Sequence, residues 1–270
     1  MKRSRILIMA LVGIAGATET GSIDPLNELA DICAEHNIYY HVDGAWGAPT
    51  LMSEKYGHLV AGIDRADSVT IDGHKQFYMP MGCGMVYFKN PHILERIAYH
   101  ARYIARPGSV DLGIKSLSGS REANSLVLAS ALQIMGTRGY SLLLEHGIET
   151  AKAFAAEIRK RPLFELVTKP RLNILTYRVC PPETKALLKE ADTLKSRRLN
   201  AYLNDMNRGI QVLQREGGIS FVSRTTLFAN NNPDDPIVVL RAVIMNPMTS
   251  IRILKEILDE QEEIYRRHFS

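Results

Sequence analysis

Short apolar stretches alternate with helix-like segments through the first half of the chain. Residues 6–12, 38–42, 66–71 and 84–88 are apolar runs of strand length, and a Pro/Gly turn precedes the last of them. Continuous apolar runs of this kind are typical of parallel strands that are buried on both faces. The alternation therefore predicts a parallel sheet covered by helices.

The segment after the first run has the features of a helix start. Asp24 is a residue type that caps helices, and Pro25 suits the first helical position. Leu26, Leu29 and Cys33 then recur at helical spacing. We therefore predict a helix with one apolar face in this segment.

From Arg121 the spacing of apolar residues becomes mainly helical. The pattern predicts, in order, helices over 121–136 and 139–160, strands over 164–168 and 173–179, a helix over 192–216, strands over 219–224 and 237–245, and an amphipathic helix over 249–268. We divide the chain into two domains. Residues 1–147 form part of a large domain, and residues 148–270 form a smaller α/β domain.

The composition is typical of a globular protein, with 46% hydrophobic and 23% charged residues in a chain of 270. The net charge of +4 comes without a basic run, which argues against a nucleic-acid partner. Three cysteines without a zinc or disulfide pattern favour a reducing cytoplasm. The apolar start resembles a signal peptide as well as a strand. We assign it to a strand because a cofactor-site pattern follows, and we expect no membrane span and no metal site.

Two segments carry the candidate chemistry, HVDGAWG at 41–47 and DSVTIDGHK at 67–75. Asp43 and Lys75 each follow a predicted parallel strand, at the sheet edge where open α/β proteins bind ligands. An acid and a lysine at this edge suit a cofactor with a basic ring nitrogen and an aldehyde. The carboxylate keeps the ring nitrogen protonated, so that the ring accepts electrons from the substrate. The lysine condenses with the aldehyde to a Schiff base.

An isolated Asp and an isolated Lys are more often a loop cap and a solvated surface lysine. Here two small residues, Gly44 and Ala45, follow the acid, and a flat ring needs a small side chain against its face. Asp72, Gly73 and His74 precede the lysine and form a turn whose polar groups can reach a phosphate. These surroundings favour the cofactor site.

Both segments resemble the group II pyridoxal-5'-phosphate (PLP) dependent amino-acid decarboxylases. HVDGAWG is similar to the family's His-Val-Asp-Ala-Ala-Trp-Gly, with Gly44 in place of the first alanine. Ser68 and Val69, followed after five residues by Lys75, fit the family's lysine signature. GATETGSIDP at 16–25 is similar to a third family segment, and the resemblance weakens beyond about residue 180. Within the group, the chain looks closest to bacterial enzymes described as aspartate 1-decarboxylases or glutamate-decarboxylase-like.

The resemblance implies a role for each matching residue. Lys75 carries the cofactor, Asp43 pairs with the pyridinium nitrogen, and Ala45 lies against the ring. The remaining implied sites are Thr18 beside the cofactor, Asp72 and His74 near the phosphate, Tyr103 as a proton donor in a mobile loop, and Arg121 for site organisation or a substrate carboxylate. Two alternatives stay open, since Tyr103 also suits ordinary packing and Arg121 also suits an ion pair at a helix start.

The resemblance further implies a fold-type-I, aspartate-aminotransferase-like enzyme that decarboxylates an acidic amino acid, aspartate or glutamate, as a homodimer. The alternatives are an aromatic substrate, another fold-type-I reaction such as sulfur removal from cysteine, and an inactive fragment that needs a partner. Family enzymes are longer at the N-terminus. We therefore expect a fragment whose sheet has unpaired edges and exposed apolar surface.

Overall fold

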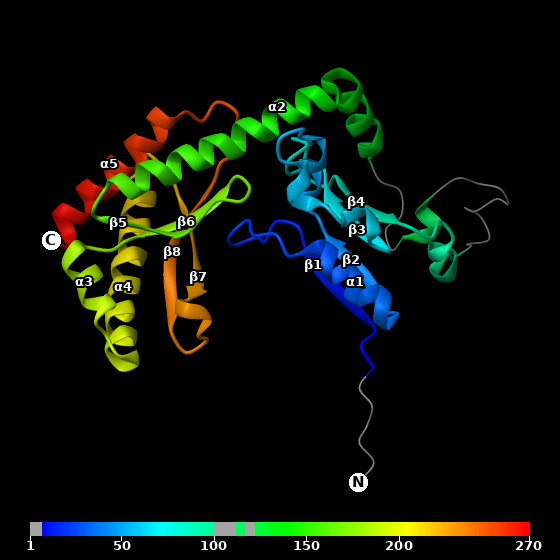
Figure 1. The fold of residues 1–270 in the computed structure, drawn as a ribbon. Helices are drawn as coiled ribbons and strands as arrows, with labels where there is room; N and C mark the ends of the chain where they lie inside the picture. The colour runs from blue at the N-terminus through cyan, green and yellow to red at the C-terminus, as the bar shows by residue number, and fades with distance from the viewer. Residues whose placement is uncertain (1–6, 100–111, 117–121) are drawn as a thin grey trace, which may run out of the picture. The chain divides into compact units, whose positions relative to one another are not determined.

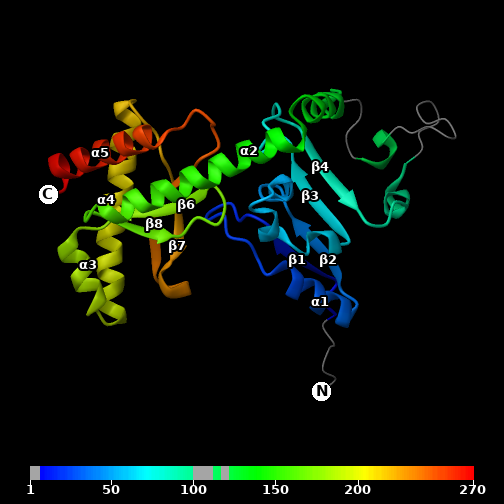
Figure 2. The ribbon, with the colours of Figure 1, turned by 45° about the horizontal axis from the view of Figure 1, so that its top comes forward.

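A computed structural model describes residues 7–99, 112–116 and 122–270. The chain divides into two compact units, and segments of each are interleaved in the sequence. The first unit consists of Met1–Ala15 and Asp24–Tyr140, and the second consists of Gly16–Ile23 and Ser141–Ser270. Each unit has its own sheet (Figures 1 and 2).

The sheet of the first unit has four strands in the order in which they occur in the sequence. They are β1 (Ala10–Ile14), β2 (Tyr39–Asp43), β3 (Ser68–Asp72) and β4 (Gly84–Phe88). The first three are parallel, whereas β4 runs antiparallel to β3. The sheet is therefore mixed, and its parallel part contains the two strands that precede the candidate chemistry.

Helix α1 (Leu26–His36) covers one face of this sheet (Figure 2). Its buried residues include Leu26, and the hydroxyl of Tyr40 on β2 donates a hydrogen bond to the Leu26 carbonyl. The predicted capping role of Asp24 is wrong. The helix begins after Pro25 without a side-chain cap, and the Asp24 carboxylate accepts a hydrogen bond from the backbone of Ile14 at 2.8 Å. Asp24 thus ties the end of β1 to the start of the helix.

Several short turns of 3-10 helix occur in the first unit after β2. Those between β2 and β3 are Ala48–Met52, Gly57–Val60 and Ile63–Arg65. Further along the chain come Ile93–Ile97 and Leu112–Lys115. The strand predicted over 6–12 begins at Ala10 in the structure, because the ladder with β2 starts there, and the apolar Leu7 and Met9 before it are exposed.

The second unit has an antiparallel sheet in the order β5-β6-β8-β7. The strands are β5 (Phe164–Thr168), β6 (Ile174–Val179), β7 (Ser223–Phe228) and β8 (Pro236–Val243), with a short 3-10 turn, Ala229–Asn231, after β7. The helices are the end of α2 (Asn124–Lys160), then α3 (Pro182–Lys189), α4 (Thr193–Gly217) and α5 (Ile251–His268). Side chains of β6, β8, α2, α4 and α5 form one apolar core.

Helix α2 includes both of the helices that were predicted on either side of residues 137–138. Its backbone leaves the helical conformation at Gly136, with φ 61° and ψ 176°. A positive φ of this kind is readily adopted by glycine. The division between the two units falls further along the same helix, after Tyr140.

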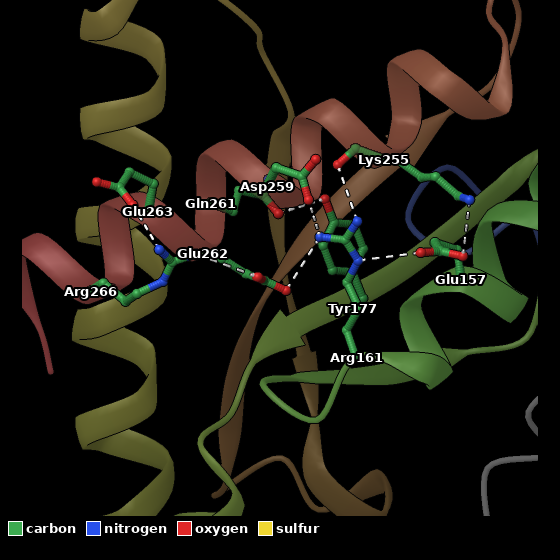
Figure 3. Close-up of polar contacts among 9 residues, drawn as sticks. All are labelled: Glu157, Arg161, Tyr177, Lys255, Asp259, Gln261, Glu262, Glu263 and Arg266. Carbon is green, nitrogen blue, oxygen red and sulfur yellow. Dashed lines mark hydrogen bonds and ion pairs between the residues drawn. The ribbon is translucent and has the colours of Figure 1, made fainter.

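A cluster of charged side chains around Arg161 ties the end of α2 to α5 (Figure 3). Nη1 of Arg161 donates to Asp259 at 2.6 Å and to Glu262 at 3.3 Å, and its Nε donates to Glu157 at 3.4 Å. Burial lowers the pKa of Arg161, but the hydrogen bonds and negative charges of Asp259 and Glu262 outweigh this effect and raise the pKa overall. Among the described residues, no helix is long and apolar enough to span a bilayer.

Candidate active site

The ends of β2 and β3 form the candidate site in the first unit. Asp43 is the last residue of β2, and Asp72 is the last residue of β3. Because the two strands are parallel, both carboxylates follow the carboxyl end of a strand at the same sheet edge. Asp43 lies opposite Thr70 in the register, and its side chain is exposed.

The loop after Asp43 is held by its neighbours on both sides. Oδ1 of Asp43 accepts the backbone N–H of Ala45 at 3.1 Å, and the carbonyl of Asp43 accepts the N–H of Ala15 at 2.8 Å. The carbonyl of Ala45 in turn accepts the N–H of Asp72 at 3.3 Å. Ala45 is half-buried and is fixed between the ends of β1 and β3.

Gly44 occupies the tightest position of this loop. A Cβ built there lies 2.7 Å from the Cβ of Ala48 and 3.1 Å from the carbonyl oxygen of Thr70. Both neighbours are backbone or one bond from it, so neither can turn away. The departure from the family's alanine at this position therefore has a steric reason in this chain.

Lys75 follows β3 in a tight turn, and its ammonium is paired with Asp72. Nζ of Lys75 lies 2.8 Å from Oδ2 of Asp72, and the two side chains are 33% and 20% exposed. The backbone N–H of Lys75 donates to the carbonyl of the same aspartate at 3.3 Å. Lys75 is thus accessible at the sheet edge and has a carboxylate as its immediate neighbour.

His74 is held on the opposite side of the turn by the start of β4. Its Nδ1 lies 2.9 Å from the carbonyl oxygen of Cys83, which also accepts the His74 backbone N–H at 3.2 Å. Because a carbonyl oxygen only accepts, Nδ1 carries a hydrogen. Nε2 is directed at Asp72, 3.7 Å from Oδ2. Gly73 permits this approach, since a Cβ there lies 2.5 Å from Sγ of Cys83.

A small apolar cluster packs against the segment that follows Lys75. Phe77 and Cys83 pack with Leu128 and Tyr140 of α2. The rings of Phe77 and Tyr140 meet edge to face at 5.1 Å, and the Tyr140 hydroxyl donates to the Phe77 carbonyl at 3.2 Å. These contacts fix the backbone two residues after Lys75.

His41 is a polar residue of this sheet face to which sequence reasoning assigned no role. Its Nδ1 lies 2.8 Å from Oγ of Ser68, and its Nε2 lies 3.2 Å from Oγ1 of Thr70. Alternate residues of a strand share a face, so His41 lies on the same face as Asp43. Polar residues alternate at 41 and 43 and at 68, 70 and 72, and this alternation was the sequence signal that His41 belongs to a polar face of the sheet.

Of the remaining predicted site residues, Thr18 is the one that the structure describes. Thr18 belongs to the second unit and is exposed, and its carbonyl accepts a 2.7 Å hydrogen bond from Nε of Arg241. Burial lowers the pKa of Arg241, and the negative charge of Glu19 opposes this effect. Sequence reasoning missed Arg241, although an arginine inside the apolar strand PIVVLRAV was a usable signal. Tyr103 and Arg121 lie outside the described residues.

The residues present at the edge of the first sheet fit PLP. They offer a carboxylate after one strand, a small residue beside it and a lysine after the next strand, which are the groups that such a cofactor requires. Residues 1–180 match the pyridoxal-dependent decarboxylase conserved domain. The chain belongs to this family.

Relatives and solved structures agree with this assignment. The chain is 48% identical to an aspartate 1-decarboxylase of Aliivibrio fischeri over 97% of its own length and 48% of the relative. It is 30% identical to an aromatic-L-amino-acid decarboxylase of Bacillus atrophaeus over 92% of its length and 49% of the relative. The chain thus spans about half the length of the curated relatives it matches.

The fold is shared with solved decarboxylase structures. The structure of mouse CSAD in its apo form matches with a TM-score of 0.81 at 24% identity, over 95% of this chain and 52% of that one. Oryza sativa TDC with PLP and tryptamine matches with a TM-score of 0.74 at 19% identity, over 96% of this chain and 48% of that one. The predicted fold type I is confirmed, and so is the resemblance to group II decarboxylases.

Proposed function

We propose that this chain is the part of a PLP-dependent decarboxylase that carries the cofactor lysine, and that the substrate is an acidic amino acid, aspartate or glutamate. The observation that carries the proposal is the placement of Asp43 and Lys75 after adjacent parallel strands, inside a segment that matches the decarboxylase family. The family match also favours decarboxylation over sulfur removal from cysteine.

Each residue of the sheet edge has a specific task in this proposal. Lys75 attaches the cofactor through its amine, Asp43 holds a proton on the ring nitrogen, and the methyl group of Ala45 rests against the ring. His74 lies on the phosphate side of the lysine turn, as the family resemblance implies. The bound cofactor supplies an electron sink for the pair of electrons that the departing carboxylate leaves behind.

The acidic substrate is supported by the names of the relatives. Besides the aspartate 1-decarboxylase of Aliivibrio fischeri, the chain is 26% identical to an acidic amino acid decarboxylase of Xenopus tropicalis. Arg121 is the cation that the family resemblance implies for a substrate carboxylate.

An aromatic substrate is the second candidate, because a relative of that name matches over 92% of the chain. Our main proposal, a decarboxylase of acidic amino acids, also includes Tyr103 as the proton donor and a domain boundary near residue 147. It further includes a homodimer and a cytoplasmic location. Sedimentation of the chain at micromolar concentration tests the dimer, and a monomer there counts against it.

The test of the cofactor site uses the visible spectrum of the purified chain with PLP, before and after borohydride reduction. We expect an absorbance band that reduction abolishes, and mass spectrometry is expected to find the cofactor on Lys75. Lys75→Ala is expected to lose both signals, while Lys89→Ala, which removes an exposed lysine of the same unit, keeps them. Labels scattered over many lysines would contradict the proposal.

A further inference from the structure

We propose that Asp72 is the resident counter-ion of Lys75, and that this ion pair must open before Lys75 can accept a cofactor. Asp72 is then a positioning residue that controls loading. The inference rests on the proposed role of Lys75 as the attachment point. It changes the task of Asp72, which the family resemblance assigns to the phosphate.

The first support is the geometry of the turn. Asp72 and Lys75 are three residues apart, and the backbone N–H of Lys75 donates to the Asp72 carbonyl at 3.3 Å. The turn is closed further by the N–H of Met79, which donates to the carbonyl of Gly73 at 3.0 Å. This backbone brings the ammonium to 2.8 Å from the carboxylate. The pair is therefore part of the turn.

The second support is that the two carboxylates at this sheet edge, Asp43 and Asp72, have different bonding partners. Oδ1 of Asp43 accepts the N–H of Ala45 in its own loop, whereas Oδ2 of Asp72 meets the ammonium of Lys75. Nε2 of His74 is directed at the same oxygen from 3.7 Å. Asp72 thus faces both groups that the cofactor needs, the amine for its aldehyde and the imidazole for its phosphate.

The chemistry of attachment makes this pairing an obstacle. Lys75 attacks an aldehyde only as a neutral amine, so its ammonium first gives one proton to solvent. The nitrogen lone pair then forms the bond to the carbonyl carbon, and the two remaining hydrogens leave with the carbonyl oxygen as water. In the ion pair the Lys75 nitrogen is held 2.8 Å from the Asp72 carboxylate, so this contact must break before the nitrogen can turn toward an aldehyde. An anion that approaches His74 is repelled by the same carboxylate.

The test measures how fast Lys75 reacts with acetic anhydride in the absence of cofactor, by mass spectrometry of the modified peptide. Asp72→Asn keeps the shape and an acceptor oxygen but removes the charge. We expect Lys75 to react about two- to fivefold faster in this variant, the range that a partly exposed ion pair supports. Attachment of PLP is expected to accelerate by a similar factor.

The matched control is Asp31→Asn, which removes the same charge from another ion pair of the first unit, Asp31 with Arg65 at 2.5 Å. In the Asp31→Asn variant, Lys75 is expected to react with acetic anhydride at the same rate as in the unmodified chain. Equal rates in Asp72→Asn and the unmodified chain would overturn the inference. Should Asp72→Asn fail to fold, sodium chloride replaces it, because salt screens the pair. Acetylation of Lys75 relative to Lys89 in the unmodified chain is then expected to rise with salt, and a constant ratio overturns the inference.

The same experiment separates this inference from the proposed function. Faster acetylation in Asp72→Asn, together with PLP on Lys75, supports both. Faster acetylation without PLP on Lys75 in any variant supports the counter-ion role and contradicts the proposed function.

Discussion

Gly44 illustrates how a single atom constrains the candidate site. The backbone between Asp43 and Ala45 passes so close to Ala48 and to β3 that the loop has no space for a methyl group. The same loop carries the carboxylate and the small residue that are proposed to contact the cofactor ring. The space at residue 44 therefore decides where these two groups lie.

We predict that Gly44→Ala destabilises the first unit, by about 1–3 kcal/mol, the usual cost of overpacking. Ala48→Gly removes the atom that lies 2.7 Å from the new methyl group, so the double variant is expected to recover part of the loss. Thermal unfolding of the four proteins measures this coupling. Gly57→Ala is the control, because the nearest atom to its Cβ is 3.5 Å away. Equal melting temperatures for Gly44→Ala and Gly57→Ala would contradict the steric explanation.

Most elements followed from the hydrophobic pattern, and the exceptions have physical causes. The strand over 84–88 agrees with β4 in its bounds, but its antiparallel direction depends on a turn that the apolar pattern does not encode. Helix α3 was missed because it has eight residues and buries none of them, so it carries no apolar stripe. The strand predicted over 219–224 lies at Ser223–Phe228, where alternate residues are half-buried.

The candidate site was predictable as far as it depends on strand ends. Asp43 ends β2 and Lys75 comes three residues after the end of β3, so a strand prediction places both at one edge. The partner of Lys75 was not predictable, since it depends on the conformation of a four-residue turn. Residues 16–23 also escaped prediction, because contacts distant in the sequence assign them to the second unit. The bond between Arg241 and the carbonyl of Thr18 is one of these contacts.

At the scale of elements, Arg161 holds the end of α2 to α5 in the second unit (Figure 3). We predict that Arg161→Met lowers the free energy of unfolding by about 1–3 kcal/mol, because it leaves the half-buried Glu157 and Glu262 without this partner. The side chain of Arg161 is only 15% exposed, so water replaces its hydrogen bonds poorly.

Urea unfolding measures this loss. The control is Arg252→Met on α5, which removes an ion pair with Glu256 whose arginine side chain is 78% exposed. Exposed pairs contribute about 0–1 kcal/mol, so the control is expected to unfold close to the unmodified chain. If both variants lose the same stability, the burial of Arg161 is not what makes its cluster stabilising.

At the scale of the whole molecule, the sheet of the first unit has apolar surface in contact with water. Within the described residues, β1 pairs with β2 alone, and its Val12 and Ile14 are exposed. Val86 on β4 is exposed as well. Surface of this kind suits burial against further polypeptide. The relatives that match this chain are about twice as long, so they contain further polypeptide that could cover such a surface.

We therefore predict that carbon dioxide release from aspartate rises when the half of the Aliivibrio fischeri relative that this chain does not match is co-expressed with this chain. Aspartate is expected to react faster than an aromatic amino acid by about tenfold or more, since a site built for a second carboxylate is left with an unpaired cation by an aromatic side chain. Radiolabelled substrate with trapped carbon dioxide measures both rates. The complemented Lys75→Ala chain is the control, and it is expected to release none. Release that persists in this variant would place the activity in another protein, and a preference for the aromatic substrate would move the assignment to the second candidate.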